Sequence, residues 1–213
     1  MSRIAAVVFD LDGVLIDATE WHYEALNRAL ALFGYTISRY EHLAAYNGLP
    51  TRRKLEMLTI EKGLPASLHD LIVRLKQRYT TDEIITKCRP TFEKEYMLSR
   101  LQRDGYRLAV CSNAVRDSVA LMLRQAGLID YFEFLLSNED VSRPKPDSEV
   151  YCKALTRLGI KPAELAVVED AQYGVEAALG ATPNVCQVSG VNDVDYFRVR
   201  GFIDAADRRG MTA

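Results

Sequence analysis

Two acids separated by one residue follow a short apolar run near the beginning of the sequence. Residues 5–9 are Ala, Ala, Val, Val and Phe, and Asp10, Leu11, Asp12 and Gly13 come next. A continuous apolar run that ends in a turn signal is typical of a buried parallel strand, and open α/β folds bind ligands at the carboxyl ends of such strands. If the chain stays extended, Asp10 and Asp12 point to the same side. Neighbouring carboxylates repel each other, so the pattern favours a hard divalent cation such as Mg2+ beside them.

Further polar residues stand where later apolar runs end, or in a loop between them. They are Ser112 and Asn113 after residues 107–111, Lys145 in a loop with two prolines, and Glu169 and Asp170 after residues 165–168. Because parallel strands end at one edge of a sheet, these side chains are expected to converge with the first two acids. Each segment alone also has an ordinary interpretation. Acids and Gly are common in turns, a strand-end Ser or a loop Lys needs no function, and an acid often caps a helix.

The segments between these residues predict the elements that position them. Four amphipathic helices are expected, with no strand between them. They cover residues 20–33, residues 38–46, a segment that begins after Thr51, and residues 67–80. Thr51 can cap the third of these helices. We therefore predict a separate helical unit over residues 17–82.

From residue 90 onward, helices and strands alternate. The expected helices cover residues 91–104, 117–125, 148–158 and 174–179, and the expected strands cover residues 107–113, 132–136, 165–168 and 185–188, the last at a sheet edge. Repeated strand–helix units predict a parallel sheet with right-handed crossovers. The predicted fold class is α/β, with a Rossmann-like core over residues 1–16 and 83–213 and the helical unit inserted after the first strand.

Composition argues against several classes of function. The chain has 213 residues, 48% of them hydrophobic, and its 27 basic and 29 acidic residues give a net charge of -2. This near balance gives no reason to expect nucleic acid or an anionic membrane as a partner. No apolar run approaches the roughly 18 residues of a membrane span, and the first strand begins too early for a signal peptide. Four scattered cysteines without metal-site spacing are expected to be reduced thiols in a cytoplasmic protein.

Together the polar segments resemble the four motifs of the haloacid dehalogenase-like superfamily, in its phosphatase and β-phosphoglucomutase-like branch. The matching segments, in the family's order, are Phe-Asp-Leu-Asp-Gly-Val-Leu-Ile-Asp at residues 9–17, Leu-Ala-Val-Cys-Ser-Asn at residues 108–113, Pro-Lys-Pro-Asp at residues 144–147 and Val-Val-Glu-Asp-Ala-Gln-Tyr-Gly at residues 167–174. The resemblance extends from about residue 5 to about residue 190. It implies an α/β core with a small helical cap, which corresponds here to residues 17–82.

The resemblance also implies catalytic roles. In the family the first Asp is the nucleophile, here Asp10, and the second is the general acid and base, here Asp12. Lys145 supplies a positive charge between the nucleophile and the phosphoryl group. Ser112, together with Asn113 and nearby backbone N–H groups, binds the phosphoryl oxygens of the substrate.

A Mg2+ ion is the cofactor that the resemblance implies. Its ligands would be the Asp10 carboxylate, the Asp12 backbone carbonyl and Asp170. Glu169 belongs to the same metal site, in an indirect role rather than as a direct ligand.

Two residues of the predicted cap are candidates for substrate binding. His22 lies near the start of the first cap helix, where members of the branch commonly have a histidine. The alternative interpretation is that His22 is a partly buried helix residue without a role in binding. Arg52 belongs to the basic segment at residues 48–54, where the family keeps its specificity loop. That segment either reaches an anionic substrate or forms a solvated helix face.

The predicted activity is Mg2+-dependent hydrolysis of a small phosphorylated metabolite, such as a sugar phosphate, through an aspartyl phosphate. A β-phosphoglucomutase-type mutase is the main alternative, because it forms the same intermediate and the basic segment keeps a second phosphate site open. Haloacid dehalogenation fits less well, since it needs neither Asp12 nor Mg2+. A non-catalytic binding protein on the same fold is a further alternative. For the oligomeric state, a monomer is favoured.

Overall fold

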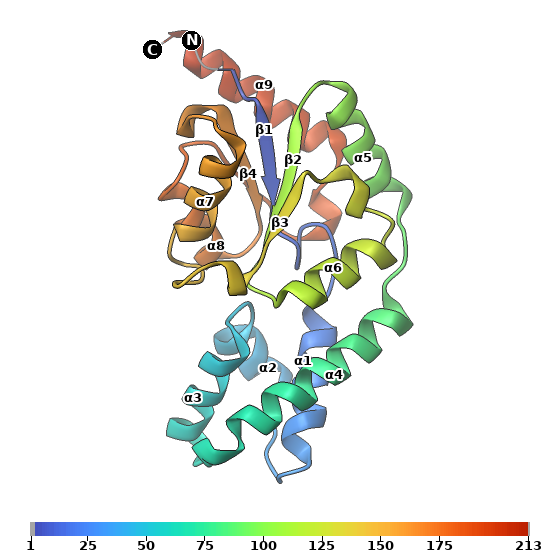
Figure 1. Ribbon diagram of the computed structural model, residues 1–213, viewed down its shortest axis with the longest axis vertical. Coiled ribbons are helices and arrows are strands. Elements are labelled where there is room, and N and C mark those ends of the chain that lie inside the picture. The colour runs from blue at the N-terminus through green and yellow to red at the C-terminus, as the bar shows by residue number, and fades with distance from the viewer. Residues whose placement is uncertain (1–2, 213) are drawn as a thin grey trace. The chain divides into compact units, whose positions relative to one another are not determined.

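Two compact units make up the protein. The first comprises Met1–Asp17 and Arg89–Ala213, and the second comprises Ala18–Cys88. The structure is a computed structural model that describes residues 3–212, with side chains as far as residue 209 (Figure 1). The sequence predicted a boundary at residue 82. That position lies inside helix α4 (His69–Lys87), which continues past the expected end of this helix at residue 80, so the structural boundary comes later.

A five-stranded parallel sheet forms the centre of the first unit. Its strands are β1 (Ala6–Phe9), β2 (Arg107–Cys111), β3 (Phe134–Leu136), β4 (Leu165–Glu169) and β5 (Val185–Gln187). The strand order is β3-β2-β1-β4-β5, so β5 lies at an edge as the sequence predicted. The α/β fold class with a Rossmann-like parallel sheet is therefore confirmed. The expected strand at residues 132–136 is shorter, because Ile129–Tyr131 forms a 3-10 turn just before it.

Strand register determines which polar residues meet at the carboxyl edge. Phe9 at the end of β1 pairs with Val110 of β2 on one side and with Val168 of β4 on the other. The next residue of each chain segment, Asp10 or Glu169, therefore emerges at the same level of the sheet. The Asp10 N–H continues this ladder by donating to the Val168 carbonyl at 3.0 Å.

Helices cover both faces of the sheet (Figure 1). They are α5 (Phe92–Arg103), α6 (Arg116–Gln125), α7 (Glu149–Leu158), α8 (Gln172–Leu179) and α9 (Tyr196–Thr212). Helices α7 and α8 pack together on one face, and α5 packs with α9 on the other. Alternate strand residues such as Ala6 and Val8 face α7 and α8, where they form an apolar core with Tyr151 and Ala154.

Helix α9 was missing from the sequence prediction, which assigned no element after residue 188. Its signal is present in the sequence, since Val199, Ile203 and Ala206 repeat at helical spacing and are buried. The helix completes the layer that α5 begins.

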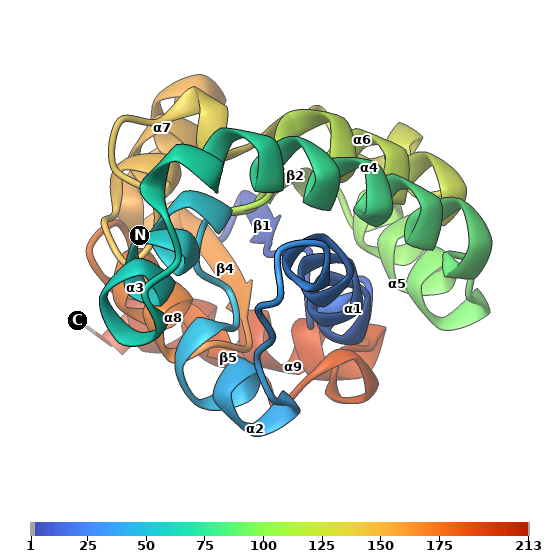
Figure 2. The same ribbon diagram turned by 90° about the horizontal axis from the view of Figure 1, so that it is seen from below.

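The second unit is entirely helical (Figure 2). It contains α1 (Thr19–Ala31), the short α2 (Arg39–Glu41), a π-helix at His42–Tyr46, α3 (Thr51–Lys62) and α4. Helices α1 and α4 make the most extensive contact within it. Its own apolar core includes Leu26, Leu30, Leu55, Leu58 and Ile72. The second unit therefore has a hydrophobic core of its own.

Two local expectations in this unit are wrong. Residues 38–46 do not form one α-helix, because the chain changes to π-type bonding, in which the Asn47 N–H donates to the His42 carbonyl at 2.7 Å. Thr51 does not cap α3. It is the first residue of the helix, and Pro50 stands at the cap position without a side-chain hydrogen bond.

Within residues 3–212, no helix is long and apolar enough to cross a membrane. None of the four cysteines, all of which lie in the described part of the chain, forms a disulfide, and only Cys152 is exposed.

Burial predicts which leucines of the α/β unit maintain its stability. Leu165 in β4 is 0% exposed, whereas Leu179 at the end of α8 is 58% exposed. Leu165→Ala should lower the free energy of unfolding by about 2–5 kcal/mol, because it leaves a cavity in the core. The matched Leu179→Ala change should stay within about 0.5 kcal/mol of the wild type. Urea unfolding followed by circular dichroism measures both, and equal losses would contradict this core assignment.

Candidate active site

Asp10 is the residue that directly follows β1, and it is 5% exposed. The chain does not stay extended beyond it, because the N–H groups of Leu15 and Ile16 both donate to the Leu11 carbonyl and close a turn. The extended conformation in which Asp10 and Asp12 were expected to share a face is therefore not maintained. The Asp12 carboxylate nevertheless lies close enough to raise the pKa of Asp10.

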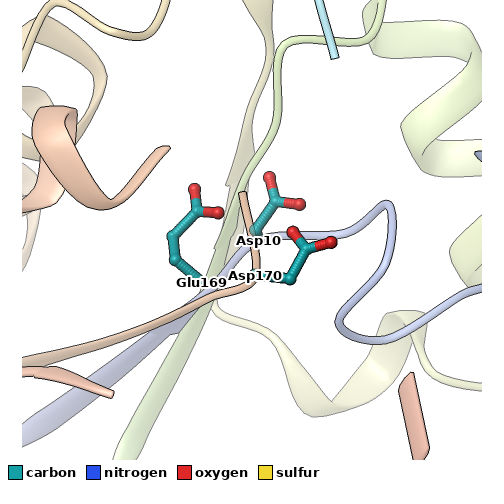
Figure 3. A group of neighbouring side chains, drawn as sticks. All are labelled: Asp10, Glu169 and Asp170. Carbon is teal, nitrogen blue, oxygen red and sulfur yellow. The ribbon is translucent and has the colours of Figure 1, made fainter. Parts of the chain in front are cut away.

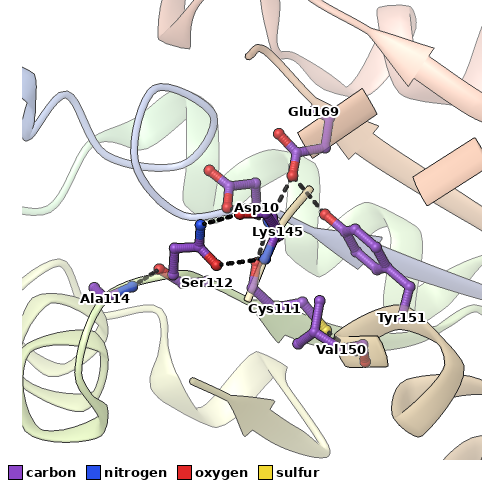
Figure 4. A network of polar contacts seen from close by, with 9 residues as sticks. Asp10, Cys111, Ser112, Ala114, Lys145, Val150, Tyr151 and Glu169 are labelled. Carbon is purple, nitrogen blue, oxygen red and sulfur yellow. Dashed lines mark hydrogen bonds and ion pairs between the residues drawn. The ribbon is translucent and has the colours of Figure 1, made fainter. Parts of the chain in front are cut away.

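Lys145 connects the ends of β1, β2 and β4. Its Nζ donates to Asp10 Oδ1 at 2.7 Å, to Glu169 Oε1 at 2.5 Å and to the Cys111 carbonyl at 2.9 Å (Figure 4). The side chain is 0% exposed. An ammonium group has three N–H donors, and here each has an acceptor. The structure thus brings together three of the residues that the sequence singled out.

Asn113 fixes the backbone of the Lys145 loop. Its Oδ1 accepts from the Lys145 N–H at 3.0 Å, and its Nδ2 donates to the Lys145 carbonyl at 3.2 Å. The sequence assigned Asn113 to substrate binding. In the structure its amide serves to position Lys145, because both of its polar atoms face that backbone.

Ser112 follows β2 and is 2% exposed. Its N–H donates to the Leu136 carbonyl at 3.0 Å, and its Oγ accepts from the Ala114 N–H at 3.0 Å. Neither of these hydrogen bonds uses the hydroxyl proton. This residue remains a candidate donor at the sheet edge.

Asp10, Glu169 and Asp170 form an acidic group that could hold a metal ion (Figure 3). One carboxylate oxygen from each lies within 4.8 Å of the others. Among the described residues, Glu169 Oε2 and Asp170 Oδ1 are buried and have no hydrogen-bond partner. Buried anionic oxygens without donors are costly, and hard carboxylate ligands suit Mg2+ or Ca2+. The residues present therefore fit the predicted cation.

The electrostatics of the group point the same way. Burial raises the pKa of Asp10 well above its usual range, Glu169 and Asp12 add to this, and Lys145 opposes it. Burial, followed by the charge of Glu169, raises the pKa of Asp170 to about 6. Burial alone would lower the pKa of Lys145, but the two carboxylates outweigh it and keep the ammonium charged. The ammonium group of Lys145 is a single positive charge among several carboxylates. A bound cation would add positive charge there and so favour the ionised forms of these acids.

Two glycines make room for the acids. A Cβ on Gly13, whose φ is +88°, would lie 2.1 Å from Asp170 Oδ2. A Cβ on Gly174 of α8 would lie 2.2 Å from Glu169 Oε1 and 2.3 Å from Oε2. Neither position therefore accepts a side chain without moving a carboxylate.

Sequence reasoning did not find Tyr151. This residue of α7 is 0% exposed, and its hydroxyl donates to Glu169 Oε1 at 2.5 Å. Its ring centroid lies 4.9 Å from Lys145 Nζ. An aromatic residue on an amphipathic helix looks like any other core residue, so no local signal distinguished it.

His22 and Arg52, the two candidates of the helical unit, contact other residues of that unit. His22 on α1 is half-buried, and its Nδ1 lies 3.2 Å from Lys76 Nζ of α4. Arg52 on α3 is 68% exposed in its side chain and forms an ion pair with Asp70 at 2.9 Å. This contact favours the alternative in which Arg52 belongs to a solvated helix face. Their part in substrate binding stays a prediction.

Comparison with known proteins agrees with this geometry. A family model described as haloacid dehalogenase-like hydrolase matches residues 7–188. A phosphorylated carbohydrates phosphatase of Thermotoga maritima is 30% identical over 181 residues, which cover 83% of this chain and 81% of that protein.

Solved structures with the same fold include CbbY from Rhodobacter sphaeroides in complex with phosphate. It superposes with a TM-score of 0.80 at 25% identity and covers 88% of this chain and 87% of its own. A putative β-phosphoglucomutase from Thermotoga maritima superposes with a TM-score of 0.68 at 25% identity and covers 96% of this chain and 92% of its own.

The contact of Gly13 with Asp170 predicts a specific defect. Gly13→Ala should weaken Mg2+ binding on the order of tenfold or more, because the new methyl group displaces a carboxylate of the acidic group. Gly105→Ala is the matched control, since Gly105 has a φ of +91° and nothing within 4 Å of the added Cβ. It should cost only the backbone strain, about 1–2 kcal/mol of stability. Isothermal titration calorimetry measures the Mg2+ affinity, and wild-type affinity in Gly13→Ala would contradict the assignment of Asp170.

Proposed function

The chain belongs to the haloacid dehalogenase-like hydrolase family, and from this we propose that it is a Mg2+-dependent phosphatase. It would hydrolyse a small phosphorylated metabolite, with sugar phosphates the first class to test, through an aspartyl phosphate. The observation that carries the proposal is the buried contact of Lys145 with both Asp10 and Glu169. This contact combines a nucleophile and a fixed positive charge beside acids that suit a cation. A relative that is a phosphatase of phosphorylated carbohydrates supports the same class of reaction.

Asp10 is the group to which we assign attack on phosphorus. Lys145 holds its Oδ1 at 2.7 Å and so fixes the orientation of the carboxylate. Attack by a carboxylate oxygen forms an aspartyl phosphate while the bond from phosphorus to the substrate oxygen breaks. The ammonium charge of Lys145 also stabilises negative charge on the phosphoryl oxygens, which is the main task of a protein in phosphoryl transfer.

Asp12 is the residue to which we assign proton transfer. It is half-buried in the turn after β1, beside the other acids. It gives a proton to the leaving oxygen as the first phosphorus–oxygen bond breaks. It then takes a proton from the water that attacks the aspartyl phosphate, and this step releases phosphate and restores both Asp10 and Asp12.

The residues that would hold Mg2+ are Asp10, Asp170 and the carbonyl of Asp12, with Glu169 beside them. When bound, the ion neutralises charge on the acids and on the phosphoryl group. We assign the Ser112 hydroxyl to a phosphoryl oxygen. Because its Oγ already accepts from the Ala114 N–H, its proton is the group that remains for donation.

The proposal predicts metal-dependent release of phosphate. Purified protein tested against a panel of phosphorylated metabolites should release inorganic phosphate from at least one of them in the presence of Mg2+. EDTA should stop the release, and added Mg2+ should restore it, because the acids repel one another and the phosphoryl group without a cation. Undiminished turnover in EDTA, with metal content shown to be nil, would contradict the metal assignment.

Asp10→Asn tests the nucleophile. The amide has nearly the shape of the carboxylate but cannot form the acyl phosphate, so turnover should fall by a factor on the order of 10^4 or more with little loss of fold. Asp130→Asn, an exposed acid away from the acidic group, is the matched control and should retain wild-type turnover. Mass spectrometry checks for deamidation back to Asp. Substantial activity in the intact Asn variant would exclude Asp10 as the nucleophile.

A phosphosugar mutase would use the same aspartyl phosphate. The similarity to a putative β-phosphoglucomutase supports mutase activity as a second candidate function. The two activities differ in what accepts the phosphoryl group. A phosphatase passes it to water, and a mutase passes it to a sugar hydroxyl. Asp10 variants therefore cannot separate them.

We expect free phosphate to be the main product. The assay supplies β-glucose 1-phosphate with glucose 1,6-bisphosphate and follows glucose 6-phosphate and inorganic phosphate together. If glucose 6-phosphate accumulates over many turnovers while inorganic phosphate stays constant, the protein is a mutase and the phosphatase proposal fails.

A further inference from the structure

Tyr151 is a buried residue that the proposed reaction does not use. Its hydroxyl donates to Glu169 Oε1 at 2.5 Å, and its ring lies against the Lys145 ammonium (Figure 4). It comes from α7, whereas Glu169 ends β4. A tyrosine hydroxyl that donates to a carboxylate at this distance makes a strong, charge-assisted hydrogen bond.

The two oxygens of Glu169 have different surroundings. Oε1 receives two donors, the Tyr151 hydroxyl and the Lys145 ammonium, both at 2.5 Å. Oε2 is buried and has no donor within the part of the chain that is described. This second oxygen belongs to the carboxylate that forms the acidic group with Asp10 and Asp170.

Gly174 limits the carboxylate from another direction. Its Cα lies so close that a Cβ there would be 2.2 Å from the Glu169 carboxyl carbon. The backbone of α8, the Lys145 ammonium and the Tyr151 hydroxyl therefore hold Glu169 in one orientation. Rotation that turned both oxygens toward a cation would break two charge-assisted hydrogen bonds.

We propose that Tyr151 is a positioning residue that restricts Glu169 to one available oxygen and thereby favours Mg2+ over Ca2+ at the acidic group. The inference rests on the cation site of the proposed function and adds the residue that selects the ion. In this inference Glu169 meets the cation directly, through Oε2 alone.

The coordination preferences of the two ions explain the selectivity. Mg2+ takes six ligands at 2.0–2.1 Å in near-ideal octahedral geometry and keeps several waters. Ca2+ takes 6–8 oxygen ligands at 2.3–2.6 Å and often uses both oxygens of a carboxylate. A carboxylate that can offer only one oxygen therefore meets the needs of Mg2+ and leaves Ca2+ short of a ligand.

Tyr151→Phe tests the inference, because it removes the hydroxyl and keeps the ring over Lys145. Mn2+ is the probe: the protein is titrated with Mn2+ without substrate, free Mn2+ is measured by electron paramagnetic resonance, and Mg2+ or Ca2+ is then added as a competitor. The ratio of the Ca2+ to the Mg2+ dissociation constant should fall on the order of tenfold in the variant, a change that corresponds to the loss of one hydrogen bond. Tyr196→Phe is the matched control. It removes a tyrosine hydroxyl that donates to Asp104 Oδ2 at 2.8 Å, away from the acidic group, and should leave the ratio unchanged.

The outcomes separate this inference from the proposed function. If the wild type binds Mn2+ and Mg2+ but Tyr151→Phe keeps the wild-type ratio, the role of Tyr151 is wrong and the phosphatase proposal stands. If the wild type binds no divalent cation, both fail. A defect that was only structural would lower the affinity for both ions together and leave the ratio constant, which would also overturn the inference.

A crystal structure of the wild type with Mg2+ gives a second test that needs no variant. The Tyr151 hydroxyl should still donate to Glu169, and Glu169 should present no more than one oxygen to the ion. Chelation of Mg2+ by both Glu169 oxygens, with Tyr151 released, would overturn the proposal.

Discussion

The ammonium group of Lys145 is enclosed by protein, so protein atoms must compensate its charge. Asp10 and Glu169 do so at 2.7 and 2.5 Å, and the Cys111 carbonyl takes the third donor. Removing one partner of a buried ion pair leaves an uncompensated charge, typically at a cost of about 3–5 kcal/mol. The ends of three adjacent strands are thus tied together through one nitrogen atom. The same contact that stabilises the sheet edge also holds the proposed nucleophile in place.

The sequence predicted the parts of the site that depend on strand ends. Asp10, Glu169 and Asp170 each follow a continuous apolar run, and a parallel sheet brings such ends to one edge whatever their separation along the chain. The α/β class, the inserted helical unit and the convergence of Lys145 with the acids followed from that pattern. These features depend on the order of the elements and on which residues are buried, and both can be inferred from the hydrophobic pattern of the sequence.

What the sequence did not predict depends on contacts between side chains of different elements. Tyr151, which looks ordinary in the sequence, reaches Glu169 from another layer of the fold. Asn113, which the sequence assigned to substrate binding, turns its amide to the Lys145 backbone. Arg52 forms an exposed ion pair with Asp70, a partner 18 residues away that no local pattern reveals. Helix α9, in contrast, had a clear periodic signal that was overlooked rather than absent.

The central position of β1 has a consequence for the order in which the chain acquires structure. β1 is the first strand, yet its partners begin only at Arg107 and Leu165, after the whole Ala18–Cys88 unit. On a ribosome, the helical unit leaves the exit tunnel complete, with its own core, while the apolar β1 still has both edges unpaired. Because its pairings close long loops, the sheet has a high contact order and forms late. One edge of β1 therefore stays without its partner strand until residues 165–169 have been synthesised.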